Sequence, residues 1–195
     1  MIKSKSDLRS ELLQKRNSLS YFEREVFSHS ISSNLFDSED IRKISIFHCY
    51  CSYGSEVITN ELIQRVLSFD IQVVVPVVKN TKGELLHFTI TSETIFEKGS
   101  YGIPQPTSIS EITIDKLNNQ NVLIIVPVVG FDVSCNRIGY GGGYYDRFLQ
   151  QVPNARKIGI AFSLQELESI LIEKTDIPLD VIVTEKKVFL RSNSI

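Results

Sequence analysis

Short apolar segments rich in β-branched residues alternate with segments of helical spacing along most of this chain. The clearest apolar segments are residues 44–50, 71–78, 122–129 and 157–162. Such runs, apolar at nearly every position, are typical of strands that are buried on both faces of a sheet. Strands that alternate with helices predict an α/β layer fold.

Capping residues, turn residues and shorter patterns predict the remaining elements. Ser4-x-x-Asp7 and Ser20-x-x-Glu23 fit the capping box ahead of apolar residues at helical spacing, so we expect two helices at the start of the chain. Ser163-x-x-Glu166 predicts the cap of a later short helix. Further predicted elements are a helix around 62–67, a turn at 80–83, a strand at 85–90, an irregular connection at 97–113, a helix at about 143–151, and one or two strands within 180–190.

The length of 195 residues, with no internal repeat and no linker of biased composition, predicts a single domain over residues 1–195. No segment approaches the roughly 20 apolar residues of a membrane helix, and the N-terminus is too charged for a signal peptide. We therefore expect a cytoplasmic protein with no membrane partner. The three cysteines, an odd number, are expected to be reduced and to bind no metal.

The charge balance argues against a nucleic-acid partner. Twenty-one Lys and Arg residues against 23 Asp and Glu residues leave a net charge of -2. The chain therefore has no large positive field that would steer it onto nucleic acid. An RNA-binding accessory protein has little support, because tyrosines cluster in one glycine-rich loop without the aromatic strand motif of an RNA-recognition domain.

A glycine-rich segment from Arg137 to Asp146 lies between a predicted buried strand and a predicted helix. Backbone amides and a helix N-terminus both face an anion in such a place, so phosphate is the natural ligand, and Arg137 would add a bidentate clamp. The segment matches neither a Walker loop nor the G-x-G-x-x-G fingerprint. The alternative is a tight strand-to-helix turn in which Asp146 merely favours the helix dipole.

Together with its preceding strand, this segment reads VPVVGFDVSCNRIGYGGGYYDRFL, and it resembles the signature of the 5-formyltetrahydrofolate cyclo-ligase family. Lys5-x-x-Leu8-Arg9 resembles the family's N-terminal helix, and Tyr50-x-Ser52-x-x-x-Glu56-Val57-x-Thr59 resembles its folate-side loop. Residues 102–106 resemble a further pocket loop, and residues 159–165 and 176–185 resemble the closing strands. The resemblance therefore runs over nearly the whole chain.

The resemblance implies a single α/β domain with a central mixed, mostly parallel sheet flanked by helices. It also implies an ATP- and Mg²⁺-dependent enzyme that converts 5-formyltetrahydrofolate into 5,10-methenyltetrahydrofolate, with ADP and phosphate released after phosphorylation of the formyl oxygen. Its partners would be these small-molecule substrates, and we expect a monomer. A non-catalytic nucleotide or folate sensor on the same fold is the alternative, because fold alone does not decide function.

The resemblance also implies roles for individual residues. The catalytic residues are Arg137 and Tyr144. The metal ligands are Asp146 and Asp176. The ATP-binding residues are Lys5, Ser6, Asp7, Leu8, Arg9, Arg137, Ile138, Gly139, Tyr140, Gly141, Gly142, Gly143, Tyr144 and Tyr145. The substrate-binding residues are Arg9, Cys51, Glu56, Tyr140, Gly141, Gly142, Gly143 and Tyr144. Tyr140 stands where many relatives carry Arg, His or Lys, so one possible cation on the phosphate side is missing.

Structural roles remain as alternatives for several of these residues. Lys5 and Arg9 are four apart and share a helix face, which a solvated basic surface also explains. Glu56 can cap the following helix instead of contacting the pterin, and Cys51 can serve packing alone. Asp176 can be a loop residue before a proline turn. The chain's histidines, His29, His48 and His87, share no spacing and are expected to be ordinary strand or surface residues.

Overall fold

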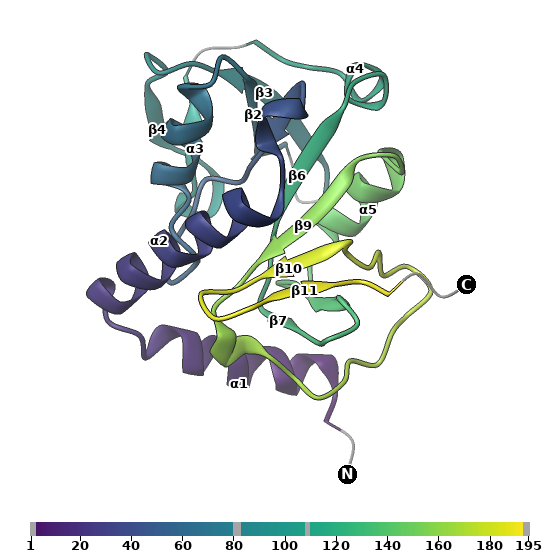
Figure 1. Ribbon diagram of the computed structural model, residues 1–195. Coiled ribbons are helices and arrows are strands. Elements are labelled where there is room, and N and C mark those ends of the chain that lie inside the picture. The colour runs from purple at the N-terminus through teal and green to yellow at the C-terminus, as the bar shows by residue number, and fades with distance from the viewer. Residues whose placement is uncertain (1–2, 80–82, 108–109, 193–195) are drawn as a thin grey trace.

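The computed structural model describes residues 3–79, 83–107 and 110–192, and it contains a seven-stranded central sheet (Figure 1). The strand order is β11-β10-β9-β6-β1-β2-β3. The five inner strands are parallel, while β3 and β11 add antiparallel edges. The expected α/β fold with a mixed, mostly parallel sheet is therefore confirmed. The strands are β1 (Ile46–His48), β2 (Gln72–Val78), β3 (Leu85–Ile90), β6 (Val122–Pro127), β9 (Arg156–Ile160), β10 (Val181–Val183) and β11 (Val188–Leu190).

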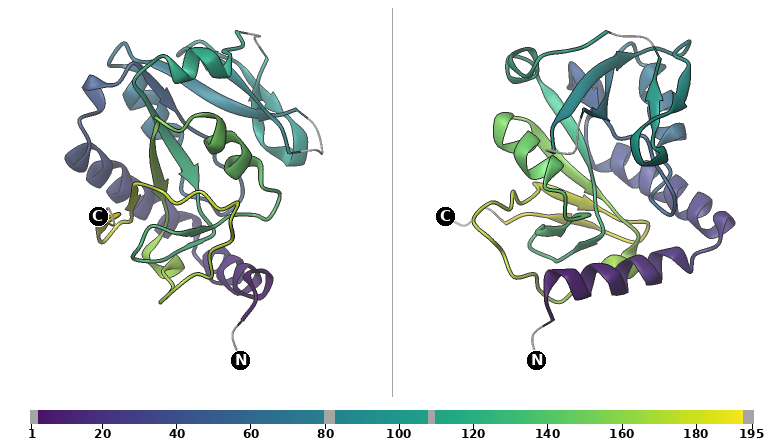
Figure 2. Two further views of the ribbon diagram at one scale, coloured as in Figure 1. Left: turned by 90° about the vertical axis from the view of Figure 1, so that its right-hand side faces the viewer. Right: turned by 180° about the vertical axis from the view of Figure 1, so that it is seen from behind.

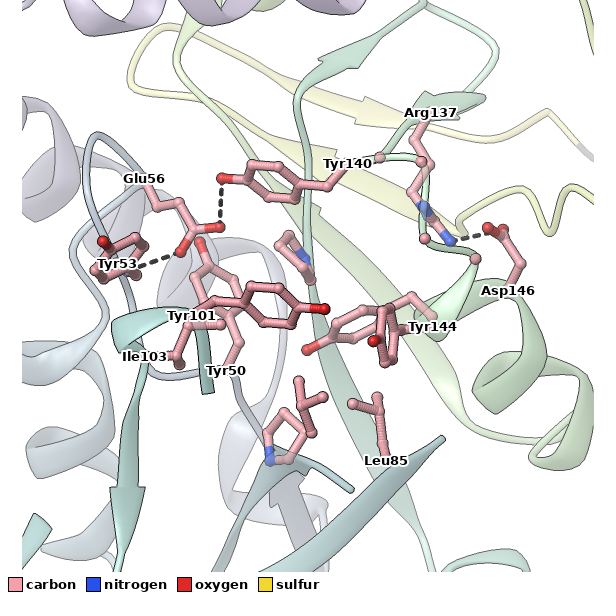
Figure 3. A pocket seen from close by; sticks show the side chains of 18 of the residues that line it. Tyr50, Tyr53, Glu56, Leu85, Tyr101, Ile103, Arg137, Tyr140, Tyr144 and Asp146 are labelled. Carbon is pink, nitrogen blue, oxygen red and sulfur yellow. Dashed lines mark hydrogen bonds and ion pairs between the residues drawn. The ribbon is translucent and has the colours of Figure 1, made fainter. Parts of the chain in front are cut away.

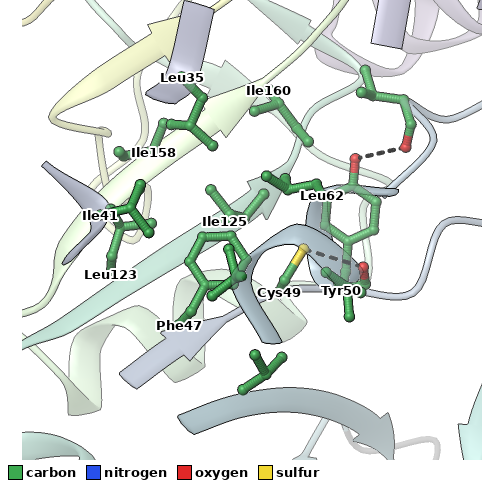
Figure 4. Close-up of a cluster of buried hydrophobic side chains, with 14 of the residues drawn as sticks. Leu35, Ile41, Phe47, Cys49, Tyr50, Leu62, Leu123, Ile125, Ile158 and Ile160 are labelled. Atoms are coloured by element: carbon green, nitrogen blue, oxygen red, sulfur yellow. Dashed lines mark hydrogen bonds between the residues drawn. The ribbon is translucent and has the colours of Figure 1, made fainter. Parts of the chain in front are cut away.

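Each face of the sheet buries alternate residues of the same strands. On one face, α2 (Tyr21–Ser38) and α3 (Asn60–Leu67) cover side chains such as Phe47, Val73 and Leu123 (Figure 4). On the other face, α4 (Ile114–Asn118) and α5 (Tyr144–Gln151) cover the alternate set, which includes Ile46, Val74 and Ile124. Figures 1 and 2 show these helix pairs on opposite sides of the sheet. Side chains alternate between the two faces along each strand, and both faces are buried. Nearly every position in these strands is therefore apolar.

The two N-terminal helices begin where the capping boxes predict. Ser4 caps α1 (Lys5–Asn17) with Asp7, and Ser20 caps α2 with Glu23. Each serine side chain accepts a backbone N–H, and each carboxylate reaches back to the serine's own N–H. Helix α1 lies across the end of the sheet, where it packs against the 3₁₀ helix η3 (Ser163–Gln165) and against β7 (Gly130–Phe131) (Figure 1).

Two predictions of local structure were wrong. The connection at 97–113 is not wholly irregular, because β4 (Phe96–Lys98) and β5 (Pro104–Pro106) pair as an antiparallel ribbon around the 3₁₀ helix η2 (Ser100–Gly102). Ser163 does not cap a helix with Glu166. Its hydroxyl and N–H instead contact Glu185, and Gln165 accepts the N–H of Phe162 at the start of η3.

Several short elements have no clear pattern in the sequence. Sequence patterns did not predict α4, or the paired two-residue strands β7 and β8 (Arg137–Ile138). Most of the predicted turn at 80–83 lies outside the described residues. The three cysteines are free and buried. Within the described ranges, no helix is long and apolar enough to cross a membrane.

Candidate active site

A cavity of about 730 Å³ opens at the carboxyl edge of the parallel strands. Tyr50 and Cys51 reach it just after β1, Pro76–Val78 from the end of β2, and Pro127 from the end of β6. The paired register of β1 and β2 ends at His48 and Val74, so Pro76 lies beyond the last parallel partner. Crevices at this edge are the usual ligand sites of open α/β sheets.

The glycine-rich loop after β8 forms one end of the cavity. Gly141 and Gly143 adopt positive φ angles of 96° and 67°, and Gly143 is the N-cap of α5. A Cβ atom at Gly141 would lie 3.1 Å from the guanidinium carbon of Arg9. Arg9 reaches this position from α1 and donates a hydrogen bond of 2.8 Å from Nε to the carbonyl of Gly139. Glycine therefore lets Arg9 pack directly on the loop backbone.

Arg137 is buried beside this loop and pairs with Asp146. Its Nη2 lies 2.7 Å from Oδ1 of Asp146, and its Nε has no hydrogen-bond partner within the described part of the chain. Burial lowers the pKa of Arg137, and the charge of Asp146 opposes that shift. An arginine remains protonated in this setting, so a buried cation with one unused donor borders the cavity (Figure 3).

A second ion pair lies close by on the same cavity wall. Lys5 of α1 contacts the carboxylate of Asp176, and its Nζ also lies 3.2 Å from Oε1 of Glu173. The Lys5 side chain is 19% exposed, so it is not part of a solvated basic face. Asp176 also accepts the N–H of Glu173 at 2.7 Å and donates its own N–H to the carbonyl of Glu173, so the two residues close a turn over 173–176.

Glu56 lies at the other end of the cavity and is nearly buried. Its Oε2 accepts the N–H of Tyr53 at 2.8 Å, and its Oε1 accepts the hydroxyl of Tyr140 at 2.7 Å (Figure 3). Burial raises the pKa of Glu56, while Tyr140, the Tyr53 N–H and the charge of Arg16 lower it. The helix-capping alternative is wrong, because α3 begins at Asn60 and Glu56 bonds none of its N–H groups.

Aromatic and aliphatic side chains line the cavity between these two ends. Tyr101 lies on the β4–β5 ribbon with a positive φ of 57°, and its ring meets that of Tyr144 across the cavity (Figure 3). A hydrogen bond with Tyr101 raises the pKa of Tyr144. Burial raises the pKa of Cys51 to about 12, so its thiol stays protonated at neutral pH. The lining suits a planar organic ring.

The structure brings most of the predicted site residues together at this cavity. Lys5, Arg9, Cys51, Glu56, Asp146, Asp176 and every residue from Arg137 to Tyr145 line it. Ser6, Asp7 and Leu8 do not, because helical spacing turns them away from the face shared by Lys5 and Arg9. The side chain of Asp7 caps α1 instead.

Sequence reasoning missed several lining residues. They include Tyr101, Leu85 and the segment Pro76–Val78. The proline inside this β-branched run was an available signal that parallel pairing with β1 ends before Pro76, since proline interrupts pairing, although β2 itself continues to Val78 beside β3. Nothing local marked Leu85 or Tyr101, whose positions depend on pairing with distant residues.

Comparison with known proteins gives a consistent result. The model of the 5-formyltetrahydrofolate cyclo-ligase family matches residues 1–185. A Haemophilus influenzae protein named 5-formyltetrahydrofolate cyclo-ligase is 30% identical over 190 residues, covering 92% of this chain and 97% of that protein. The NMR structure of Aquifex aeolicus 5,10-methenyltetrahydrofolate synthetase matches with a TM-score of 0.84 and 33% identity, covering 98% of this chain and 94% of that one.

A Mycoplasma pneumoniae 5,10-methenyltetrahydrofolate synthetase structure matches with a TM-score of 0.74 and 26% identity, covering 94% of this chain and 99% of that one. The matches thus extend over nearly the whole fold, the strands and loops that form the cavity included. This chain therefore belongs to the 5-formyltetrahydrofolate cyclo-ligase family of enzymes.

Proposed function

We propose that this enzyme uses ATP and Mg²⁺ to convert 5-formyltetrahydrofolate into 5,10-methenyltetrahydrofolate, with ADP and phosphate as the other products. The observation that carries the proposal is a single cavity with two chemically different ends. One end has a glycine loop, the buried Arg137, the partly buried Lys5 and two carboxylates, which suit a nucleotide phosphate. The other end has aromatic walls and a buried carboxylate, which suit a planar ring that carries N–H donors.

The glycine-loop end fits the triphosphate of ATP. The unused Nε of Arg137 is a buried donor that a phosphate oxygen would satisfy, and unsatisfied buried donors are costly. Gly143, at the N-terminus of α5, adds a backbone conformation that permits close approach of an anion. Lys5 contributes a second cation from α1. The nucleotide would therefore lie between the glycine loop and α1.

The donor set also fits Mg²⁺ held jointly with the nucleotide. Asp146 and Asp176 supply carboxylate oxygens, and Mg²⁺ usually takes one or two of these and keeps several waters. Among the described residues, no group of three or more His, Cys, Asp or Glu side chains is arranged to hold a metal without such help. When bound, Mg²⁺ neutralises charge on the phosphates, which is the chemistry that phosphoryl transfer requires.

The reaction must first activate a formamide oxygen, which is a very poor leaving group. The formyl oxygen attacks the γ-phosphorus of ATP, an O–P bond forms, and the bond from that phosphorus to ADP breaks. The second folate nitrogen then attacks the activated carbon, loses its proton, and expels inorganic phosphate as the ring closes. Arg137 and Lys5 would neutralise charge on the transferred phosphoryl group. Catalysis would then depend on positioning the two substrates and on this neutralisation, with no covalent bond to a side chain.

Glu56 would orient the folate. The pterin ring offers adjacent N–H groups, and a carboxylate accepts two such donors. Glu56 is held at a fixed place by Tyr53 and Tyr140, so its orientation is set before the substrate arrives. Tyr144, at the start of α5, lies between the two ends of the cavity and would contact both substrates.

Turnover distinguishes this proposal from a non-catalytic sensor. We expect the absorbance of 5,10-methenyltetrahydrofolate to rise when the protein receives 5-formyltetrahydrofolate, ATP and Mg²⁺, and to stay flat when any one of the three is withheld. Each mole of product should accompany one mole of ADP. Tight binding of both substrates without product would instead favour the sensor.

A further inference from the structure

Arg16 is a buried arginine near the end of a helix that is otherwise largely polar. It is 3% exposed, whereas its neighbour Lys15 is 53% exposed and pairs with Glu11 at the surface. The Arg16 guanidinium donates from Nε to the hydroxyl of Ser55 at 3.0 Å and from Nη1 to the carbonyl of Val128 at 3.4 Å. Burying a cation is expensive, so this placement calls for a specific partner.

That partner is the hydroxyl of Tyr140. Nη2 of Arg16 lies 2.6 Å from the Tyr140 oxygen, which in turn lies 2.7 Å from Oε1 of Glu56. Arginine can only donate, so the phenol oxygen accepts from Arg16 and the phenol hydrogen goes to Glu56. Figure 3 shows the Tyr140 side chain extending from the glycine loop to the Glu56 carboxylate. We call this chain of hydrogen bonds, from Arg16 through Tyr140 to Glu56, the relay. Which group donates and which accepts at each step is fixed by chemistry.

The relay also controls the charge of Glu56. Burial raises the pKa of its carboxyl, and the opposing influences are the Tyr140 hydroxyl, the N–H of Tyr53 and the charge of Arg16. The other titratable groups that interact with Glu56 are Cys49, Tyr50, Cys51 and Tyr145, whose own pKa values burial raises. These four groups are neutral at physiological pH. The charge of Arg16 lowers the pKa of Glu56, and another cation that reaches the same loop, Arg24 of α2, instead donates to the carbonyl of Gly54.

We infer that Arg16 is a positioning residue for the folate, and that it acts through Tyr140 to keep the Glu56 carboxylate ionised and aimed into the cavity. Arg16 does not itself line the cavity. The inference rests on the proposed function, because it takes the Glu56 carboxylate to be the acceptor for the N–H groups of the folate ring.

The test compares the binding of 5-formyltetrahydrofolate, without ATP, between pH 5.5 and 8.5. Arg16→Gln should weaken folate binding about tenfold at pH 7, because it removes the charge that supports the hydrogen bond from Tyr140 to Glu56. It should also move the pH midpoint of binding upward, because the Glu56 carboxylate loses a charge that keeps it ionised. Arg16→Lys should restore the midpoint in part, and Tyr140→Phe should shift it in the same direction as Arg16→Gln. Lys15→Gln, which removes the neighbouring exposed cation, should bind as the parent does.

Glu56→Gln identifies the part of the profile that belongs to the carboxylate. Glu56→Gln should remove the pH dependence of folate binding that this carboxylate causes. The double variant Arg16→Gln/Glu56→Gln should then bind folate no more weakly than Glu56→Gln alone. Arg16 would only anchor α1 if the losses of folate affinity in the two single variants added in full in the double variant. The same conclusion would follow if a folded Arg16→Gln variant kept the parent's pH profile. Should Arg16→Gln not fold, Tyr140→Phe decides, because it keeps the ring and removes only the hydroxyl.

A ligand-free measurement separates this inference from the proposed function. Carboxyl ¹³C NMR of the free protein reports the titration of Glu56 directly. Its midpoint should rise in Arg16→Gln, and an unchanged midpoint would overturn the relay. A parent protein that shows the relay but binds no 5-formyltetrahydrofolate would overturn the proposed function, and with it the role of the relay in folate binding.

Discussion

At the scale of single residues, the site is built from charges that already neutralise one another. Arg137 pairs with Asp146 at 2.7 Å, and Lys5 pairs with Asp176. Each pair joins a cation suited to phosphate with a carboxylate suited to Mg²⁺. The proposed nucleotide and metal would exchange these partners, phosphate oxygens taking the cations and Mg²⁺ taking carboxylate oxygens. Neutral pairs of this kind keep a buried cavity stable without leaving an isolated charge.

Arg137→Ala tests the assignment of that residue to the nucleotide. It should weaken binding of a non-hydrolysable ATP analogue by roughly tenfold to a hundredfold, because a buried charge-assisted contact is lost, and leave folate affinity nearly unchanged. Titration calorimetry with each ligand separates the two effects. It should also cost roughly 1–3 kcal/mol of unfolding free energy, since Asp146 loses its partner.

Arg137→Ala/Asp146→Asn controls for that loss of stability. The double variant removes both charges of the pair, so it should recover part of the unfolding free energy without recovering nucleotide affinity. Nucleotide affinity equal to the parent's in a folded Arg137→Ala protein would remove Arg137 from the phosphate site.

At the scale of elements, strands with long apolar runs were predictable and short or exposed elements were not. β2 and β6 are nearly continuous apolar runs because helices cover both of their faces. β4, by contrast, is exposed at every position, and β5 contains two prolines. α4 has only five residues, too few to display a helical period, and its Thr113 cap was the one local signal.

The candidate site divides in the same way. Its glycine loop and Arg137 were predictable from a local motif, whereas Glu56 and the Lys5–Arg9 face were predicted only through the resemblance to the family. Arg16 was indistinguishable from Lys15 in the sequence, since both are basic residues near the end of α1. Its burial depends on the approach of Tyr140, which is 124 positions away along the chain. Contacts of such long range carry no periodic or local signature.

At the scale of the whole molecule, two histidines from separate strands meet inside the fold. His48 on β1 and His87 on β3 lie on either side of β2, with Nε2 of one 3.0 Å from Nδ1 of the other and Phe148 packed on both rings. Burial lowers the pKa of His48 well below 6.5 and that of His87 to about 4. As expected, both are strand residues, while His29 is exposed and contacts Glu61.

This pair predicts a loss of stability in acid. Below about pH 6.5 the unfolded chain takes up protons that the folded histidines do not, so the unfolding free energy should fall as the pH falls from 6.5 towards 4. Urea denaturation at several pH values should show a loss of roughly 3 kcal/mol from His87 alone across that range. A parent profile that is level between pH 7 and 5 would show that the two buried histidines do not govern this loss of stability.

The proposed reaction requires the cavity to bring the formyl oxygen of the folate to the γ-phosphorus of ATP. The most direct measurement follows that oxygen atom. We predict that 5-formyltetrahydrofolate labelled with ¹⁸O in the formyl group will give, in a single turnover, inorganic phosphate carrying one ¹⁸O atom, as seen by mass spectrometry or ³¹P NMR. Unlabelled phosphate, with the label released to water, would contradict direct phosphorylation of the formyl oxygen.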